Sequence, residues 1–579
     1  MRTLYEYGPR TPFAQKIHAD KYRDKNETFR ESQTRVAGAL ADDDEHFKAL
    51  REIFLYQRFL PAGRIQAAIG SLKRITPYNC YVSGTIEDSY ISGTGSIMDR
   101  AKEAAATMRL GGGIGYDFST LRPRGAMIKK LGSSSSGPVS FMEIFDAVCR
   151  ATSSSGHRRG AQMGILRVDH PDIEEFIRAK HDLSKLTGFN LSIAVTDAFM
   201  RAVQAGTSFQ LSFQGTPYQE VDARQLWETL MRSTYDYAEP GVIFIDTINR
   251  RNNLYYCESI AATNPCGEQP LPPYGACLLG SFNLTSYLDV STDNKFKFNW
   301  VRFFTDIPHV VRAMDNVVDK AIYPLYEQEK EAISKRRMGL GLTGVANCIE
   351  ALGFPYGSEG FVANLEIILR GLRDECYRAS SKLASEKGSF PLFDKEKYLA
   401  GEFVQTLAED VQEEIALNGI RNSHLLSIAP TGTISLAADN ISSGIEPVFS
   451  YGADRTVIEF SGPKVYRVED YGVAKLGVRG KTADQCTIGD HLRVLIAASK
   501  FVDSAVSKTC NVPEDIPYES FKNIYLTAWK HGAKGCTTYR VGGKRGAVLV
   551  SSEEKETAND PREAFGCTVD PVTGLASCE

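Results

Sequence analysis

The sequence predicts an α/β protein, with a largely parallel sheet or barrel that carries its helices on the outside. Strand-like runs alternate with helix-like runs through most of the chain, as is typical of such folds. Phe189–Val195 alternates apolar and polar residues like a strand, and Thr196 then caps a segment with helical spacing. A long helix is predicted over Phe361–Lys387, ending at Gly388.

Residues 1–60 are predicted to be a helical N-terminal region, which Pro61 ends. Further strands are expected in "FQLSFQG", in "GVIFIDT" and in "HLLSIA", and a helix is expected to begin at Pro171. The catalytic domain is expected to cover residues 61–548. Residues 549–579 are polar and lack periodicity, which predicts a flexible tail.

The amino-acid composition and net charge exclude several classes of protein. Of the 579 residues, 42% are hydrophobic and 24% charged, a profile typical of a soluble globular protein. The 67 basic and 71 acidic residues nearly cancel, so nothing favours nucleic-acid or membrane binding. No stretch is apolar enough for a membrane span, and the first residues lack a signal core. The twelve cysteines include no C-x-x-C pair, so we expect a cytoplasmic protein with reduced thiols and no metal site.

Asn264, Cys266 and Glu268 stand at alternate positions of a Pro/Gly-rich loop. In an extended loop these three side chains would point to the same side. The carboxylate can act as a general base, and the amide can orient a polar substrate group. A carboxylate beside a thiol raises the thiol pKa, which argues against a thiolate nucleophile. The pattern therefore favours a sulfur that donates or accepts a hydrogen atom.

Three glycine-rich segments are weaker signals. "GGGIG" lacks the spacing of a dinucleotide-binding loop. "PTGTIS", from Pro430 to Ser435, offers backbone N–H groups and hydroxyls to a phosphate, but an ordinary strand-to-helix turn with a threonine cap explains it equally well. "SSSGHRRGAQMG" is either a solvated basic turn or a loop that reaches a nucleotide.

Eight ordered motifs together resemble those of the catalytic subunit of ribonucleotide reductase, and most closely its adenosylcobalamin-dependent class. They are "GGGIGYDFSTLRPRG", "SSGPVSFM", "RRGAQMGIL", "HPDIEEFI", "NPCGEQPLPPYGACLLGSFNL", "KRRMGLGLTG", "RNSHLLSIAPTGTISLAADNISSGIEP" and "KGCTTYR". The resemblance covers Phe59 to Tyr539. It implies a ten-stranded α/β barrel with a finger loop through its centre.

The resemblance also implies a mechanism for the finger loop. Cys266 would become a thiyl radical that takes the 3′ hydrogen of a ribonucleotide. Glu268 would act as base at the 3′-hydroxyl, while Asn264 would bind the ribose hydroxyls. Cys80 and Cys277 would supply the reducing equivalents by forming a disulfide across the barrel.

Ligand-binding residues are implied in the same way. The substrate would be held by Pro430, Thr431, Gly432, Thr433, Ile434, Ser435, Gly112 and Gly113. A deoxynucleoside triphosphate or ATP effector would contact Asp88, Arg124 and Arg159. The N-terminal region is too short for an ATP cone, so we expect control of specificity without an overall on/off switch.

The tail carries Cys567 and Cys578, which resemble the pair that re-reduces the active-site disulfide by thiol exchange. A thioredoxin- or glutaredoxin-type protein would then be the outside reductant. Dimerisation with a second copy is a further family expectation. Whether diphosphates or triphosphates are reduced stays open, with a diphosphate reductase as the prediction.

The radical source is predicted from "KGCTTYR". Thr537 and Thr538 stand where enzymes with a metal-bearing partner subunit carry two tyrosines, and Tyr539 follows. A threonine cannot relay a radical, which favours adenosylcobalamin as the cofactor, although no D-x-H-x-x-G cobalamin motif is present. Two alternatives remain: a catalytic subunit that needs a metal-bearing partner, and an inactive nucleotide-binding regulator on the same fold.

Overall fold

The computed structural model describes residues 7–128, 132–153, 160–459, 462–540 and 542–544, with two short strands, β21 (Thr568–Val569) and β22 (Ala576–Ser577). Its centre is a ten-stranded mixed sheet in the order β1-β13-β2-β3-β6-β7-β10-β20-β19, with β16 also pairing with β13. The strands are β1 (Phe59–Pro61), β2 (Cys80–Val82), β3 (Gly113–Asp117), β6 (Gln162–Arg167), β7 (Phe189–Val195), β10 (Gly241–Phe244), β13 (Ala276–Asn283), β16 (Met338–Thr343), β19 (Thr509–Val512) and β20 (Gly535–Arg540).

Parallel pairing dominates this sheet. The strands β2, β3, β6, β7 and β10 are parallel neighbours, and so are β13 with β16 and β19 with β20. Antiparallel pairing joins β13 to β1 and to β2, and β10 to β20. The fold therefore confirms an α/β protein with a largely parallel sheet.

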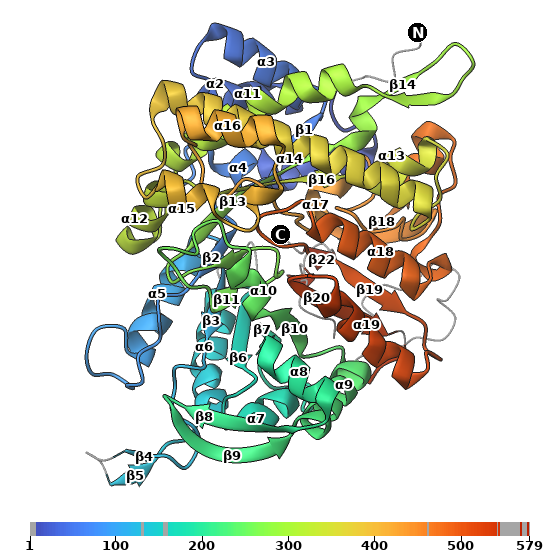
Figure 1. The fold of residues 1–579 in the computed structure, drawn as a ribbon. Helices are drawn as coiled ribbons and strands as arrows, with labels where there is room; N and C mark the ends of the chain where they lie inside the picture. The colour runs from blue at the N-terminus through green and yellow to red at the C-terminus, as the bar shows by residue number, and fades with distance from the viewer. Residues whose placement is uncertain are drawn as a thin grey trace.

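Helices surround the sheet (Figure 1). The N-terminal region holds α1 (Pro12–Tyr22), α2 (Phe29–Leu40) and α3 (Asp44–Leu55). The rest are α4 (Gly63–Ala68), α5 (Ile97–Arg109), α6 (Pro138–Ser153), α7 (Ile173–Arg178), α8 (Asp197–Ala205), α9 (Ala223–Tyr237), α10 (Ile245–Arg250), α11 (Trp300–Lys320), α12 (Tyr326–Lys335), α13 (Val345–Ala351), α14 (Glu359–Lys387), α15 (Lys395–Leu399), α16 (Glu409–Asn418), α17 (Gly432–Leu436), α18 (Ile488–Ser499) and α19 (Tyr518–Lys530). None of the described helices is long and apolar enough to cross a membrane.

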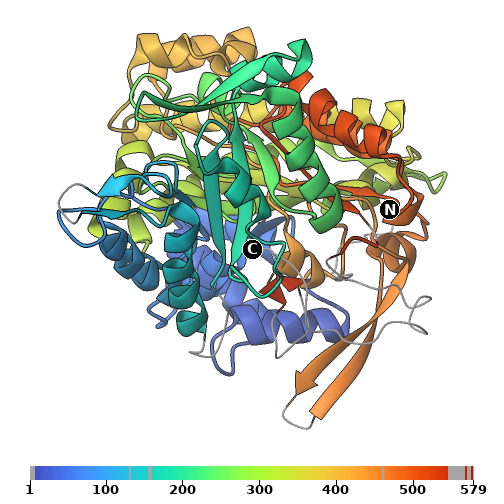
Figure 2. The same ribbon diagram turned by 90° about the horizontal axis from the view of Figure 1, so that it is seen from below.

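Two-stranded hairpins lie outside the main sheet. Figure 2 shows the ribbon of β17 (Gly452–Glu459) and β18 (Gly462–Glu469) projecting from the body of the protein. The others pair β4 (Met127–Ile128) with β5 (Ser133–Ser134), β8 (Ser208–Phe213) with β9 (Thr216–Asp222), β11 (Ala262–Thr263) with β12 (Pro270–Leu271), β14 (Leu288–Val290) with β15 (Phe296–Phe298), and β21 with β22.

Several local predictions can be compared with these elements. The strand β7 has the predicted bounds, and the Thr196 side chain caps α8 by accepting from the Phe199 N–H. The helix α14 ends at Lys387 as predicted. The predicted strand 241–247 is wrong at its end, because α10 begins at Ile245. "HLLSIA" makes only isolated bridges, Leu340 with Leu426 and Ile428 with Val506.

The buried apolar residues form two clusters. The larger one fills the space between sheet and helices. The smaller one gathers residues of the sheet, the β11–β12 hairpin, α10 and adjoining loops: Ala62, Cys80, Val82, Met163, Ile165, Ala194, Ile243, Ile245, Ile248, Ile260, Ala262, Leu271, Cys277, Leu279 and Ala429. We call it the inner cluster. Both Cys80 and Cys277 belong to it, so these two thiols lie on the inner face of the sheet.

Candidate active site

The β11–β12 hairpin forms a finger that ends in a tight turn over residues 264–269. The Gly267 N–H donates to the Asn264 carbonyl at 3.1 Å, and Gly267 has a φ of +80°. That left-handed conformation suits glycine. The loop is therefore not extended as the alternating pattern suggested, although the turn still brings Asn264 and Glu268 together.

Glycines in β3 make room for the finger. A Cβ atom at Gly115 would lie 1.8 Å from the backbone oxygen of Thr263, so no side chain fits at this position. A Cβ atom at Gly113 would lie 3.1 Å from Pro265. From the next part of the sheet, Asn190 on β7 donates from Nδ2 to the Pro265 carbonyl at 3.0 Å. The glycine-rich "GGGIG" segment thus holds the finger by close backbone approach.

One amide, one carboxylate and one thiol meet at the finger. Asn264 Nδ2 lies 2.9 Å from Glu268 Oε1 and 3.0 Å from Cys80 Sγ. The Cys80 thiol donates to Glu268 Oε1 at 3.6 Å. The orientation of Asn264 is fixed because its Oδ1 accepts from the Gln269 N–H at 3.0 Å. The three groups can therefore act on the same bound molecule.

Glu268 is held as a weak acid. Its side chain is fully buried, and this burial raises its pKa to about 7, while hydrogen bonds from the backbone, Asn264 and Cys80 act in the opposite direction. Its Oε2 atom has no hydrogen-bond partner within the described part of the chain. A carboxyl with this pKa can take or give a proton near neutral pH, which is the requirement for a general base.

Cys80 and Cys277 are direct neighbours, not partners across a barrel. The antiparallel register of β2 and β13 pairs Cys80 with Cys277. Residues opposite each other in such a ladder have Cα atoms about 4.5–5.5 Å apart, within the range that a disulfide spans. Burial raises the pKa of both thiols well above the usual value, and Glu268, Cys266 and Cys277 add to the effect on Cys80.

Cys266 stands at the turn of the finger and is more exposed than these two thiols. A Cβ atom added at Gly267 beside it would meet no heavy atom of the described residues within 4 Å. With respect to the described residues, the finger tip at Gly267 therefore has open space in front of it. This space fits the approach of a bulky group to the Cys266 thiol.

The "PTGTIS" segment forms the start of the short helix α17. Thr431 has a φ of +54°, and its side chain does not cap the helix. Its hydroxyl lies 2.9 Å from that of Thr343 and accepts from the Gly444 N–H at 2.7 Å. The Ser435 hydroxyl joins this buried group at 3.1 Å from Thr431 Oγ1. Hydroxyl contacts thus fix the turn in place of a threonine cap.

Two of the three residues predicted to bind the effector, Asp88 and Arg124, already form ion pairs within the protein. Asp88 Oδ2 lies 2.7 Å from Arg122 Nε, and Asp88 lines a cavity of about 430 Å³. Arg124 binds Glu175 at 2.5 Å with a half-exposed side chain. Arg159 lies outside the described residues, as do Cys567 and Cys578. Of the two remaining substrate candidates, Gly112 packs on Tyr81 and Gly113 on the finger.

On β20, Thr538 is buried and its hydroxyl lies 2.8 Å from that of Tyr525 on α19. Thr537 is exposed on the opposite face.

Other residues at the site have no role in the sequence prediction. Asn190, Gly115 and Gly339 contact the finger, and Thr343 contacts Thr431 at the α17 turn. Gly341 lies against the backbone of Ser427. Alternate glycines in β3 and β16 are the signal that could have identified them. Such spacing puts every missing side chain on one face of a strand, which marks the close approach of another backbone.

A fold and site of this kind define an α/β enzyme with a thiol, carboxylate and amide centre on a finger loop. The model of the ribonucleotide reductase barrel domain matches residues 78–487 and 480–539. The chain belongs to the ribonucleotide reductase family.

Relatives with high similarity carry names of one class. The chain is 36% identical to the "Vitamin B12-dependent ribonucleoside-diphosphate reductase" of Mycobacterium tuberculosis, over 82% of this chain and 69% of that protein. The protein of the same name from Thermoplasma acidophilum is 32% identical, over 83% and 66%. The "Vitamin B12-dependent ribonucleotide reductase" of Streptomyces clavuligerus is 29% identical, over 80% and 57%.

Proposed function

We propose that this chain reduces ribonucleotides to 2′-deoxyribonucleotides for DNA synthesis, with adenosylcobalamin as its cofactor. The observation that carries the proposal is the meeting of Asn264, Glu268 and Cys80 beside Cys277 and the finger tip. The names of the relatives support vitamin B12 and a diphosphate substrate. The catalytic domain would span residues 61–548, with the sheet closed into a barrel around the finger.

The cofactor proposal agrees with the local structure. Open space at Gly267 and the partial exposure of Cys266 leave room for a large group. Thr537 and Thr538 provide no redox-active side chain at the two predicted relay positions of β20, while Cys536 and Tyr539 flank them on the same strand. When bound, adenosylcobalamin would supply the radical that removes the hydrogen atom of the Cys266 thiol.

Each of the side chains at the site then has a separate role in the reaction. As a radical, Cys266 Sγ takes the hydrogen atom from C3′ of the ribose and returns it to C3′ after the 2′-hydroxyl has left. Glu268 accepts the proton of the 3′-hydroxyl, for which a pKa of about 7 is suited. Asn264 orients the ribose hydroxyls through its amide. Cys80 and Cys277 give up two electrons and two protons, so that the 2′-hydroxyl leaves as water and a disulfide forms.

Substrate phosphates are proposed to bind at residues 430–435, next to the backbone of Gly112 and Gly113. The support is the rigid α17 turn, in which Thr431 is fixed by Thr343, because the first turn of a helix offers unpaired N–H groups.

Effectors are proposed to bind near Asp88, Arg124 and Arg159. The cavity at Asp88 supports this, but Arg124 would first have to leave Glu175. Cys567 and Cys578 are proposed as the exchange pair that passes electrons from a thioredoxin- or glutaredoxin-type protein. We also propose that the chain forms a homodimer and that the protein is cytoplasmic.

The test is an assay with one protein. The purified chain receives a ribonucleoside diphosphate, a dithiol and adenosylcobalamin, and deoxynucleotide is measured. Formation is the expected result. No product without an added metal-bearing subunit would contradict the cofactor proposal, and no product under any condition would favour an inactive regulator.

A further inference from the structure

Arg337 is a buried cation beside Cys277. The parallel register of β13 and β16 pairs Leu278 with Met338, so the residues just before them, Cys277 and Arg337, are also side by side. Cys277 is fully buried, and Arg337 is 2% exposed. No step of the proposed reaction described above uses this guanidinium.

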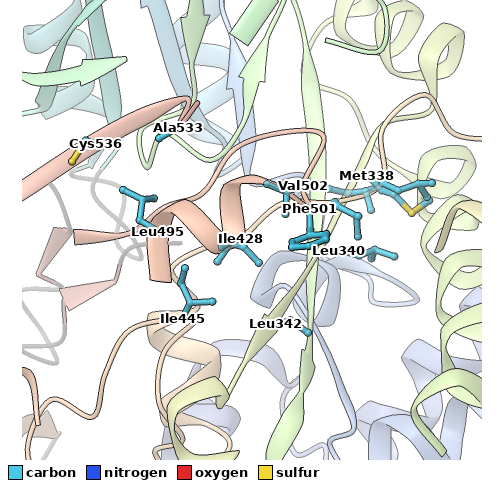
Figure 3. Packing of buried hydrophobic residues seen from close by; sticks show 14 of the residues in the cluster. Met338, Leu340, Leu342, Ile428, Ile445, Leu495, Phe501, Val502, Ala533 and Cys536 are labelled. Atoms are coloured by element: carbon cyan, nitrogen blue, oxygen red, sulfur yellow. The ribbon is translucent and has the colours of Figure 1, made fainter. Parts of the chain in front are cut away.

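Alternation along β16 directs Arg337 toward the inner face of the sheet. Figure 3 shows Met338, Leu340 and Leu342 among the packed apolar residues, together with Phe501 and Val502. The residues between them lie on the other face. There, a Cβ atom at Gly339 would lie 2.5 Å from Gln269 of the finger turn. Arg337 shares this face, as Cys277 shares the inner cluster.

The guanidinium has one hydrogen-bonded carboxylate, Glu258, and a longer ion pair with Glu331. Arg337 Nη2 donates to Glu258 Oε2, an atom that Lys335 also contacts at 2.8 Å. Arg337 Nε lies 3.7 Å from Glu331 and has no hydrogen-bond partner among the described residues. The two glutamates thus fix the position of the guanidinium, and its Nε–H is not hydrogen-bonded within the described residues. Of the charged groups near Cys277, Arg337 has the largest influence, and it lowers the pKa that burial raises.

The two thiols therefore differ in the charged group that acts on them most strongly, although Asp503, Glu268 and Glu331 also raise the pKa of Cys277. Cys80 contacts the Glu268 carboxyl at 3.6 Å, which disfavours negative charge on its sulfur. Cys277 lies beside a permanent cation, because an arginine does not lose its proton in a protein. In thiol–disulfide exchange, the sulfur that carries negative charge more easily is the better leaving group.

We propose that Arg337 is a positioning residue for the redox step, making Cys277 the leaving sulfur when the Cys80–Cys277 disulfide is reduced. This inference rests on the proposed function, which makes these cysteines a redox pair. A thiolate of the reducing dithiol attacks Cys80 Sγ and forms a mixed disulfide. The bond between Cys80 and Cys277 breaks, and its electron pair leaves on Cys277 Sγ beside Arg337, which then takes up a proton. The second thiol of the reductant attacks the mixed disulfide and releases Cys80 as a thiol.

The test measures how fast dithiothreitol reduces the oxidised full-length chain, with rapid alkylation and peptide mapping of Cys80 and Cys277. We expect Arg337→Gln to slow reduction about tenfold or more, since one pKa unit of lost charge stabilisation is a factor of ten. Arg337→Lys should restore most of the rate. Lys335→Gln is the matched control, because it removes a cation from the same ion cluster and should keep the wild-type rate.

The reduction potential of the pair separates this role from a structural one. Near pH 7 both cysteines of the reduced pair are protonated, so Arg337 faces no thiolate before or after the reaction. The potential of Arg337→Gln should therefore match the wild type while the rate falls, and its unfolding midpoint should drop because Glu258 loses a buried ion-pair partner. Arg337→Gln reduced at the wild-type rate would overturn the inference, as would a slower rate accompanied by a shift in potential, or an Arg337→Lys variant that is reduced as slowly as Arg337→Gln. Failure of the wild type to form a Cys80–Cys277 disulfide would overturn the proposed redox pair as well.

Discussion

Replacing Glu268 with glutamine should make the protein more stable and inactive. Burial raises the pKa of this carboxyl from 4.5 to about 7, so the folded chain keeps a proton that the unfolded chain has lost. Between these two pH values the unfolded state binds fewer protons, and stability therefore falls as pH rises. The loss is complete above pH 7 and amounts to about 3 kcal/mol at 1.36 kcal/mol per pKa unit.

Glu268→Gln removes this cost because an amide does not ionise, while its oxygen can still accept from Asn264 and Cys80. Denaturant unfolding of both proteins at pH 5 and pH 8 should show that the wild type loses about 2.5 kcal/mol more unfolding free energy over this range than Glu268→Gln does. Deoxynucleotide formation should fall by roughly 10²–10⁴-fold, the range for loss of a general base.

Glu350→Gln is the matched control. Glu350 on α13 is also buried, with its pKa raised to about 7, but it accepts from the backbone of Tyr356 and Lys481 and contacts no cysteine. This variant should gain stability at pH 8 and keep its turnover. A Glu268→Gln protein with the same pH dependence of stability as wild type, or with normal turnover, would refute the reasoning.

Three further changes test the finger and the thiols. Gly115→Ala should destabilise the finger and abolish activity, because its Cβ would lie 1.8 Å from the Thr263 oxygen; normal activity and an unchanged unfolding midpoint would contradict this close approach. Cys80→Ser and Cys277→Ser should each prevent the intramolecular disulfide in peptide maps and stop multiple turnover with dithiol; a wild-type rate in either would exclude that residue from the redox pair. Asn264→Ala should reduce kcat/KM about tenfold or more through loss of its hydrogen bonds, and an unchanged value would remove it from the substrate site.

The sequence predicted the alternating elements and the chemical groups better than their spatial relations. Asn264 and Glu268 meet because Gly267 turns the chain, whereas the prediction assumed an extended loop. The neighbouring positions of Cys80 and Cys277 follow from strand register, which depends on residues far apart in the sequence.

The role proposed for Arg337 could not be predicted from the sequence either. In "KRRMGLGLTG" this arginine is only a charge before a strand, and its partner Cys277 lies sixty positions earlier. The parallel pairing of β13 and β16 brings the two together, and such long-range pairing has no local signal in the chain. Glycine spacing in β3 and β16 was a local sign that another backbone packs closely against these strands.

The central claim is that the Cys266 sulfur takes the 3′ hydrogen atom of a ribonucleotide. The most direct measurement is deoxynucleotide formation from substrate deuterated at C3′, with adenosylcobalamin and a dithiol, for wild type and Cys266→Ala. The account predicts slower turnover of the deuterated substrate by the wild type and no product from the variant. Product formation by Cys266→Ala would contradict it.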